Sequence, residues 1–149
     1  MKMNNFSFTG FRNELPHLSF FSALVVDDYG PAKRLLEASL SNLPQIGEID
    51  LADSGEEALI KAGRKQYDLI FLDVTMPGLD GFETCVRIRE IKGYEITPIV
   101  MVSGNASPDS FSKWADSGCT SYVTKPIKQE SFRRLNMKMF SWLEEFKAA

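Results

Sequence analysis

The sequence predicts a doubly wound α/β domain, in which helices cover both faces of a parallel β-sheet. Short apolar runs recur along the chain, and four of them end at an aspartate, a serine or a lysine. Segments with a helical spacing of apolar residues separate these runs. Strands that alternate with helices favour βαβ units and therefore a parallel sheet. The 149 residues suit one domain with one sizeable core, without an internal repeat or a second domain.

Five strands are expected. Four of them are continuous apolar runs, which are typical of strands buried on both faces of a parallel sheet. In the fifth, Ile49 and Leu51 alternate with acidic residues, which favours a position nearer an edge. The continuous runs cover residues 23–26, 69–72, 98–102 and 121–124.

Five helices are expected between and after these strands. Pro31 suits the first turn of the first helix, and Ser54 suits the N-cap of the second. The helical patterns lie near residues 31–40, 54–59, 82–91, from 107 onward and 130–147. Together the elements predict a flavodoxin-like doubly wound (βα)5 domain over residues 21–147.

Composition excludes several classes of protein. A net charge of -3 offers no basic excess for binding nucleic acid. No segment approaches the ~20 apolar residues needed to cross a bilayer, so no membrane association is expected. Cys85 and Cys119 form neither a CxxC pattern nor a group with histidine, which argues against a zinc site and a disulfide framework. We therefore expect a soluble, cytoplasmic protein.

Two segments have no assigned role. The first is the leader, residues 1–20, which is rich in phenylalanine and could be disordered, pack on the domain or dock to a partner. The second is the end of the last helix, where Trp142 and Phe146 exceed what one buried face requires. These two side chains could form an apolar patch for a partner or for a second copy of the chain, which leaves a homodimer open.

The chemistry is expected where the strands end. In open α/β sheets ligands bind beyond the carboxyl ends of the strands, which brings Asp27, Asp28, Asp73, Ser103 and Lys125 to one edge. Adjacent carboxylates repel one another unless a proton or a cation intervenes, and Mg²⁺ prefers such oxygen ligands. Carboxylates can also act as nucleophiles toward phosphoryl groups, with a lysine and a hydroxyl as donors. These residues predict an aspartyl-phosphate site.

The same residues carry a family resemblance. Leu24 to Asp28, Asp73 to Gly81, Ser103 and the Val-Thr-Lys125-Pro126 segment resemble the response regulator receiver domain of two-component signalling. The likeness covers roughly residues 22–145, with the motifs in the family's order. It implies a five-stranded parallel sheet in the order 2-1-3-4-5.

The resemblance also implies a role for each residue of the site. Asp73 would be the phosphoacceptor, with Mg²⁺ or Mn²⁺ bound by Asp28, by Asp73, by the Thr75 carbonyl and through water by Asp27. Lys125 would contact the phosphoryl group, and the Lys125-Pro126 bond would be cis. Ser103 would be the switch hydroxyl, Tyr122 the switch aromatic, and Thr75 and Asn105 would position water.

A partner must supply the phosphoryl group under this interpretation. The one histidine, His17, lies in the leader outside any helical pattern, so a histidine kinase or a histidine phosphotransfer protein is expected to donate in trans. An unidentified downstream protein would receive the signal by contact. Whether the chain stands alone or is part of a larger regulator or hybrid kinase stays open.

Three other functions are less compatible with these residues. A phosphatase of the haloacid-dehalogenase type needs a second aspartate two residues after the nucleophile, where Thr75 stands. A degenerate receiver would lack site residues, and all are present. A flavodoxin-like cofactor site would have to overcome repulsion of phosphate by Asp27 and Asp28. An enzyme acting on other molecules is therefore not expected.

Each residue of the expected aspartyl-phosphate site could also have a purely structural role. Asp27 and Asp28 could cap the following helix, and the Asp80-Gly81 pair is expected to be a turn that starts the third helix. Ser103 could form a turn, Lys125 could be a solvated lysine, and Tyr122 could pack in the core. Their shared position at strand ends favours the functional interpretation.

Overall fold

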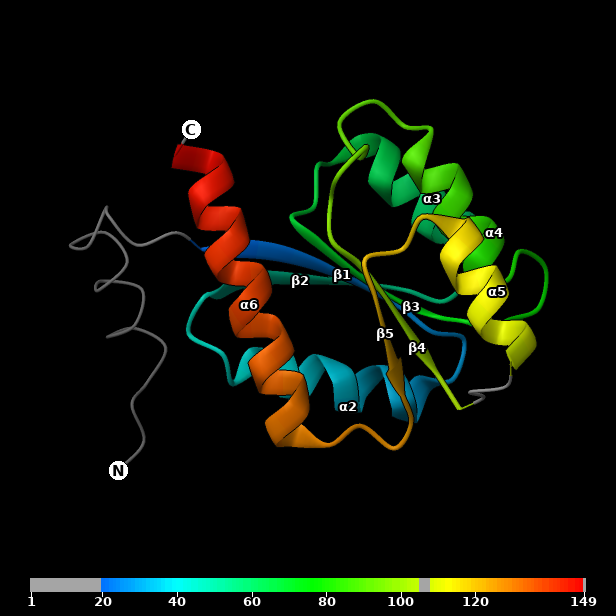
Figure 1. Ribbon diagram of the computed structural model, residues 1–149, viewed down its shortest axis with the longest axis horizontal. Helices are drawn as coiled ribbons and strands as arrows, with labels where there is room; N and C mark the ends of the chain where they lie inside the picture. Colours follow the sequence, from blue (N-terminus) through cyan, green and yellow to red (C-terminus); the bar gives the residue numbers. More distant parts are fainter. Residues whose placement is uncertain (1–19, 105–107, 149) are drawn as a thin grey trace.

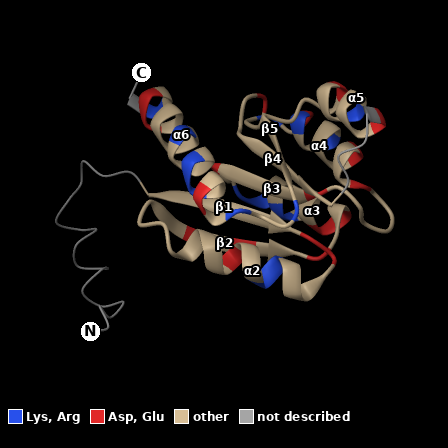
Figure 2. Cartoon of the chain, turned by 60° about the horizontal axis from the view of Figure 1, so that its bottom comes forward, with Lys and Arg blue, Asp and Glu red and all other residues tan. Residues whose placement is uncertain are grey.

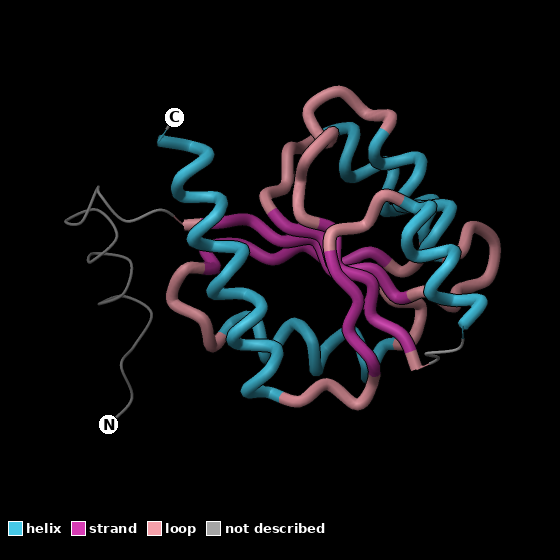
Figure 3. Tube along the Cα trace, in the orientation of Figure 1, coloured by secondary structure: helices cyan, strands magenta, loops and turns pink. Residues whose placement is uncertain are grey.

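A computed structural model describes residues 20–104 and 108–148. One sheet contains five parallel strands, β1 Phe21–Val26, β2 Ile46–Ala52, β3 Leu69–Asp73, β4 Ile99–Ser103 and β5 Ser121–Thr124. Their order in the sheet is β2-β1-β3-β4-β5, which confirms the predicted fold and order. The sheet lies between two layers of helices (Figures 1 and 3). One face is covered by α2 Gly30–Ser41 and α6 Gln129–Ala148, and the other by α3 Gly55–Arg64, α4 Gly81–Arg89 and α5 Pro108–Ser117. None of the helices in this part of the chain combines the length and apolar character that crossing a bilayer requires.

The strands lie where the apolar runs predict them, with small differences at the ends. β1 begins two residues earlier than predicted, because Phe21 and Ser22 also pair with β2. β2 is an edge strand, which confirms the inference from its alternating pattern.

The expectation that residues 121–124 are buried on both faces is wrong. β5 is the second edge strand and pairs with β4. Ser121, Tyr122 and Val123 are half-buried, and Thr124 is exposed. The run holds three hydroxyl-bearing residues, and such residues are accommodated more easily in an edge strand than in a strand buried on both faces. Tyr122 is therefore near the surface, where α5 can cover it.

Two helices, α3 and α4, begin at side-chain caps that the sequence indicates. Helix α2 has no side-chain cap and carries Pro31 in its first turn, as predicted. The Ser54 hydroxyl accepts the Glu57 N–H at 3.0 Å, and Asp80 Oδ1 accepts the Glu83 N–H at 2.8 Å. Each cap satisfies a backbone donor that the first turn leaves without a helical partner. Both basic and acidic side chains lie along α6 (Figure 2).

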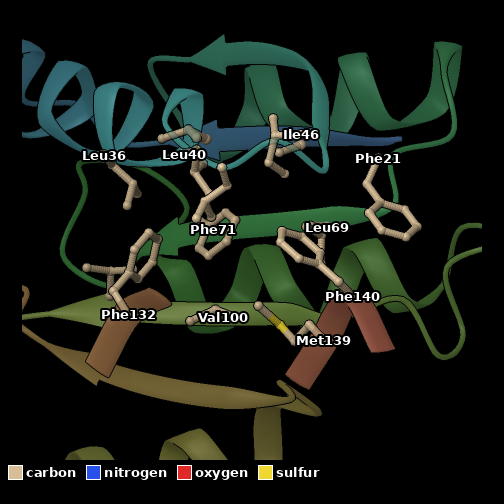
Figure 4. Packing of buried hydrophobic residues seen from close by; sticks show 14 of the residues in the cluster. Phe21, Leu36, Leu40, Ile46, Leu69, Phe71, Val100, Phe132, Met139 and Phe140 are labelled. Carbon is tan, nitrogen blue, oxygen red and sulfur yellow. The ribbon is translucent and has the colours of Figure 1, made fainter. Parts of the chain in front are cut away.

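The core has one layer on each face of the sheet. Successive strand residues point to opposite faces, so Phe71 packs toward α2 and α6 while Ile70 and Leu72 pack toward α3 and α4. The ring centroids of Phe71 and Phe132 are 5.5 Å apart, and Figure 4 shows both side chains in the core layer that faces α2 and α6. Packing on both faces fixes the central strands, and therefore fixes the residues that follow their carboxyl ends.

Candidate functional site

Three aspartates gather at the carboxyl ends of two adjacent strands. Asp27 and Asp28 follow β1, and Asp73 ends β3. The parallel register pairs Val26 with Leu72. The residues that follow them, Asp27 and Asp73, therefore lie side by side. One carboxylate oxygen from each of the three residues lies within 4.8 Å of the others. Asp27 and Asp73 are buried and Asp28 is exposed, so the cluster opens to solvent on one side.

Lys125 places an ammonium group against the two buried acids. Its Nζ lies 3.1 Å from Asp73 Oδ1 and 3.3 Å from Asp27 Oδ2. The backbone positions it from β5, since the Lys125 N–H donates to the Ser103 carbonyl at 2.7 Å. One ammonium cannot balance three carboxylates, so the ionised cluster favours a further cation.

Burial and neighbouring charges shift both groups of the central pair. Burial raises the pKa of Asp73, the charge of Asp27 raises it further, and the hydrogen bond from Lys125 opposes both. Burial alone would lower the pKa of Lys125, but the hydrogen bond with Asp73 and the charges of Asp73 and Asp27 outweigh it and raise the pKa. The lysine therefore stays charged, and the acids lie where a cation would be stabilised.

The donor set suits a hard divalent cation. Carboxylate oxygens are the ligands that Mg²⁺ prefers, and it commonly keeps several waters besides one or two carboxylates. The exposed side of Asp28 gives such waters access. Thr75 is exposed two residues beyond Asp73 and lines a hollow of about 350 Å³ between the β3–α4 loop and α5. The acids thus fit a metal, with the Thr75 segment beside them.

Ser103 reaches the same edge from β4. The register pairs Asp73 with Val102, so Ser103 lies one residue beyond the position opposite Asp73. The serine is buried and pairs with Thr124 of β5. It therefore lies between the strand that carries the central acid and the strand that carries Lys125.

Tyr122 lies on the far side of β5, in an aromatic cluster with α5. Its ring centroid is 5.5 Å from that of Trp114 and 5.9 Å from that of Phe111. The two α5 rings are 5.8 Å apart. The sequence interpretation missed this cluster, although Phe111 and Trp114 are three residues apart and share one face of a helix.

Gly81 is a second residue whose role the sequence interpretation missed. A Cβ at this position would lie 2.3 Å from the Asp73 carbonyl oxygen and 2.8 Å from the Cα of Val74. The Gly81 N–H donates to the Val74 carbonyl at 2.9 Å. The Asp80-Gly81 pair does start α4 as predicted, but the missing side chain also lets the helix begin directly against the strand that carries Asp73.

The remaining sequence predictions have mixed outcomes. Asp27 does not cap the following helix as its structural interpretation suggests, because α2 begins at the N-cap Tyr29 and has no side-chain cap hydrogen bond. Asp27 Oδ1 instead accepts the Tyr29 N–H at 2.9 Å in the loop before the helix, while Oδ2 contacts Lys125. The Lys125-Pro126 peptide bond is cis, as predicted. Asn105 and the leader up to residue 19 lie outside the described residues.

Comparison with known proteins agrees with this geometry. Residues 23–135 match the family model described as the response regulator receiver domain. The chain is 40% identical over 104 residues to the transcriptional regulatory protein ResD of Bacillus subtilis, covering 70% of this chain and 41% of ResD. It is 30% identical over 117 residues to the signal transduction histidine-protein kinase BarA of Escherichia coli, covering 78% of this chain and 12% of BarA. The chain therefore spans less than half of either relative.

Solved structures show the same fold. Chemotaxis protein CheY4 of Vibrio cholerae is 29% identical with a TM-score of 0.75, covering 81% of this chain and 99% of that one. The receiver domain of sensor histidine kinase PA1611 from Pseudomonas aeruginosa PAO1 is 27% identical with a TM-score of 0.74, covering 83% and 99%. The PA1611 structure has a magnesium ion coordinated in its active site cleft.

Proposed function

Because this chain belongs to the response regulator receiver domain family, we propose that Asp73 accepts a phosphoryl group in a two-component phosphorelay. One observation carries the assignment to this residue: Asp73 is the buried carboxylate that ends the central strand β3 and touches Lys125, whereas the other buried acid, Asp27, already accepts the Tyr29 N–H. A carboxylate in this setting can act as the nucleophile in forming an acyl phosphate.

The donor is a phosphorylated histidine on a histidine kinase or a histidine phosphotransfer protein. The bond between phosphorus and the imidazole nitrogen breaks as a bond forms between phosphorus and a carboxylate oxygen of Asp73. The bonding electron pair returns to the imidazole ring, which is left neutral or takes a proton from solvent. Lys125 stabilises the negative charge that the transferred group brings to the site.

A divalent cation, Mg²⁺ or Mn²⁺, is the cofactor of this proposal. Asp28 and Asp73 would hold it directly, the Thr75 carbonyl would be a further ligand, and Asp27 would act through water. When bound, the ion offsets negative charge on the transferring phosphoryl group. Support comes from the oxygen donors of the acid cluster and from the magnesium ion in the related PA1611 domain.

The signal leaves the site through Ser103 and Tyr122. A phosphoryl group on Asp73 draws the Ser103 hydroxyl toward it, and the Tyr122 ring then changes its packing. This shift in population changes the surface of α5 that a downstream protein contacts. Thr75 and Asn105 position the water that removes the phosphoryl group.

The chain acts on its own acyl phosphate and on no other substrate. Thr75 stands where a phosphatase of the haloacid-dehalogenase type needs an acid, which supports this restriction. Free cysteines at 85 and 119 are in keeping with a cytoplasmic location.

Phosphorylation by a small donor tests the proposal. The wild type and the Asp73→Asn variant are incubated with acetyl phosphate and Mg²⁺, and intact mass is measured by mass spectrometry. We expect the wild type to gain the mass of one phosphoryl group, lost again after hydroxylamine treatment, and the variant to stay unmodified.

Asp53→Asn is the matched control, because Asp53 is an exposed aspartate that pairs with Lys33 outside the cluster. It should be modified as the wild type is. Equal modification of the Asp73→Asn variant, or none in the wild type, would contradict the proposal. Steady hydrolysis of a generic phosphate ester, dependent on Asp73, would instead indicate a phosphatase.

A further inference from the structure

A groove lies at the opposite end of the sheet from the acid cluster. Its volume is about 540 Å³, and it lies between the end of α6 and the loops that lead into β3 and β4. A second hollow of about 310 Å³ shares two of its residues, Ile96 and Trp142. The groove is lined mainly by Ile96, Trp142, Phe146, Asp68, Glu95 and Lys147.

The groove presents apolar side chains to solvent. Ile96 is 52% exposed, Trp142 41% and Phe146 54%. The rings of Trp142 and Phe146 stack on each other with centroids 5.3 Å apart. A rigid aromatic pair beside an aliphatic side chain is typical of a surface that another apolar segment covers.

The chain enters the sheet beside this groove. Asp68, at its edge, accepts the backbone N–H of Ser22 at 2.9 Å and pairs with Lys147 at 3.0 Å. The Lys147 Nζ also lies 5.1 Å from the centroid of the Phe21 ring. Residues immediately before Phe21 are therefore tethered next to the groove.

The segment before Phe20 contains apolar side chains that could cover the apolar groove. Residues 1–19 carry Phe6, Phe8 and Phe11, together with Leu15 and Leu18. A tether of this length keeps a segment at an effective concentration in the millimolar range, so weak apolar contacts suffice for binding. We propose that the groove is an intramolecular docking site for residues 1–19, with the phenylalanines against Ile96, Trp142 and Phe146.

Fluorescence of Trp142 in the full chain tests this docking. The Trp114→Phe substitution leaves Trp142 as the only tryptophan. In that background, Phe6, Phe8 and Phe11 are all replaced by serine, and acrylamide quenching is measured. We expect the quenching constant of Trp142 to roughly double, because the tethered segment would no longer cover the ring.

Two further variants separate docking from other effects. Replacement of Asn4, Asn5 and Asn13 by alanine changes the same segment without removing apolar groups, and should leave quenching unchanged. Ile96→Ser should raise quenching as the phenylalanine substitutions do, and combining the two should add little, since each removes the same contact.

Equal quenching in the Trp114→Phe parent and in its phenylalanine variant, at every protein concentration, would overturn the proposal. Protection of Trp142 that grows with protein concentration, with dimers seen by sedimentation velocity, would also overturn it and would identify a second copy of the chain as the occupant. Neither result depends on phosphorylation of Asp73, so the two proposals fail independently.

Discussion

The ammonium of Lys125 lies 3.1 Å from Oδ1 of Asp73, so the end of the edge strand β5 is joined by an ion pair to the end of the central strand β3. The same ammonium lies 3.3 Å from Asp27. It thus offsets part of the negative charge of both buried acids. Any divalent cation that binds the cluster does so beside a positive charge already in place.

Lys125→Met removes that charge and should strengthen Mg²⁺ binding while slowing phosphorylation. Loss of one nearby positive charge should favour the metal by about 1 kcal/mol, or roughly fivefold in Kd. Phosphorylation should slow because no ammonium then stabilises the transferred group. Titration calorimetry with Mg²⁺ and mass spectrometry with acetyl phosphate measure the two effects. Lys128→Met removes an exposed charge nearby and should change neither; weaker Mg²⁺ binding in the Lys125 variant would contradict the prediction.

Mg²⁺ should stabilise the folded protein, and Asp28→Asn should abolish this effect. At roughly ten times its Kd a ligand bound only by the folded state adds about 1.4 kcal/mol to the free energy of unfolding. Asp28 is the exposed member of the cluster, so its amide variant should fold normally without metal. Thermal unfolding with and without Mg²⁺ measures the difference. Asp116→Asn, an exposed aspartate on α5, should keep the full Mg²⁺ response.

Ser103→Ala should separate phosphorylation from its readout. Trp114 lies 5.5 Å from Tyr122, so its fluorescence should report any change in the packing of that ring. In a Trp142→Phe background, beryllofluoride with Mg²⁺ should change Trp114 emission when Ser103 is present. The Ser103→Ala variant should still accept a phosphoryl group but show little change in emission. An unaltered emission change in this variant would exclude Ser103 as the link.

Gly81→Ala should destabilise the protein and impair the site together. The added methyl group would overlap the backbone of Asp73 and Val74, which no rotamer change can relieve. We expect a loss of at least about 2 kcal/mol in the free energy of unfolding. Gly63→Ala is the matched control, because its Cβ meets nothing within 4 Å on α3. That variant should gain about 0.5 kcal/mol, since alanine is the better helix former.

Tyr67→Phe should lower stability in a pH-dependent way. The Tyr67 hydroxyl donates to Asp50 at 2.6 Å, and chiefly this hydrogen bond lowers the pKa of Asp50 from its ordinary 3.8. A lowered folded-state pKa gives stability that is present above the ordinary value and is lost as pH falls through the folded-state value. The variant should therefore lose about 1 kcal/mol at pH 7, and the loss should shrink below about pH 4.

Tyr94→Phe is the control for this pH dependence. The Tyr94 hydroxyl donates to the Lys65 carbonyl and accepts the Tyr67 N–H, so it bonds no carboxylate. Removing the Tyr94 hydroxyl should lower the free energy of unfolding by the same amount at neutral and at acidic pH. Denaturant unfolding of the three proteins at pH 7 and near pH 3.5 makes the comparison. A constant difference between the wild type and Tyr67→Phe would contradict the role assigned to Asp50.

The helices and strands are predictable from the sequence, because a buried element requires a recognisable pattern of apolar residues. Residues 69–72 are packed on both faces, and such a strand needs an uninterrupted apolar run. The edge position of β5 leaves no comparable mark, since Ser121 to Thr124 mixes apolar with hydroxyl-bearing residues. Strand order likewise came from the family resemblance, because an apolar run does not specify its neighbours.

The acid cluster and Lys125 were predictable because strand ends converge. Their positions follow from the strands alone, before any side-chain contact is known. The contacts of Tyr122 with Phe111 and Trp114 depend on how α5 is rotated against β5, and the proximity of Gly81 to Asp73 depends on where α4 begins. Both are set by tertiary packing, which a single sequence does not display. The metal ligands and the roles of Thr75 and Asn105 remain predictions.

The ion pair between Asp27 and Lys125 joins residues 98 positions apart, from the end of the first strand to the end of the last. A chain emerging from the ribosome presents β1 and β3, with all three acids, long before β5 exists. Until then the growing domain holds concentrated negative charge without its counter-charge. Docking of the last strand completes the sheet and supplies the missing cation in one event. A chain that stops before residue 121 therefore keeps every acid and still lacks a complete site.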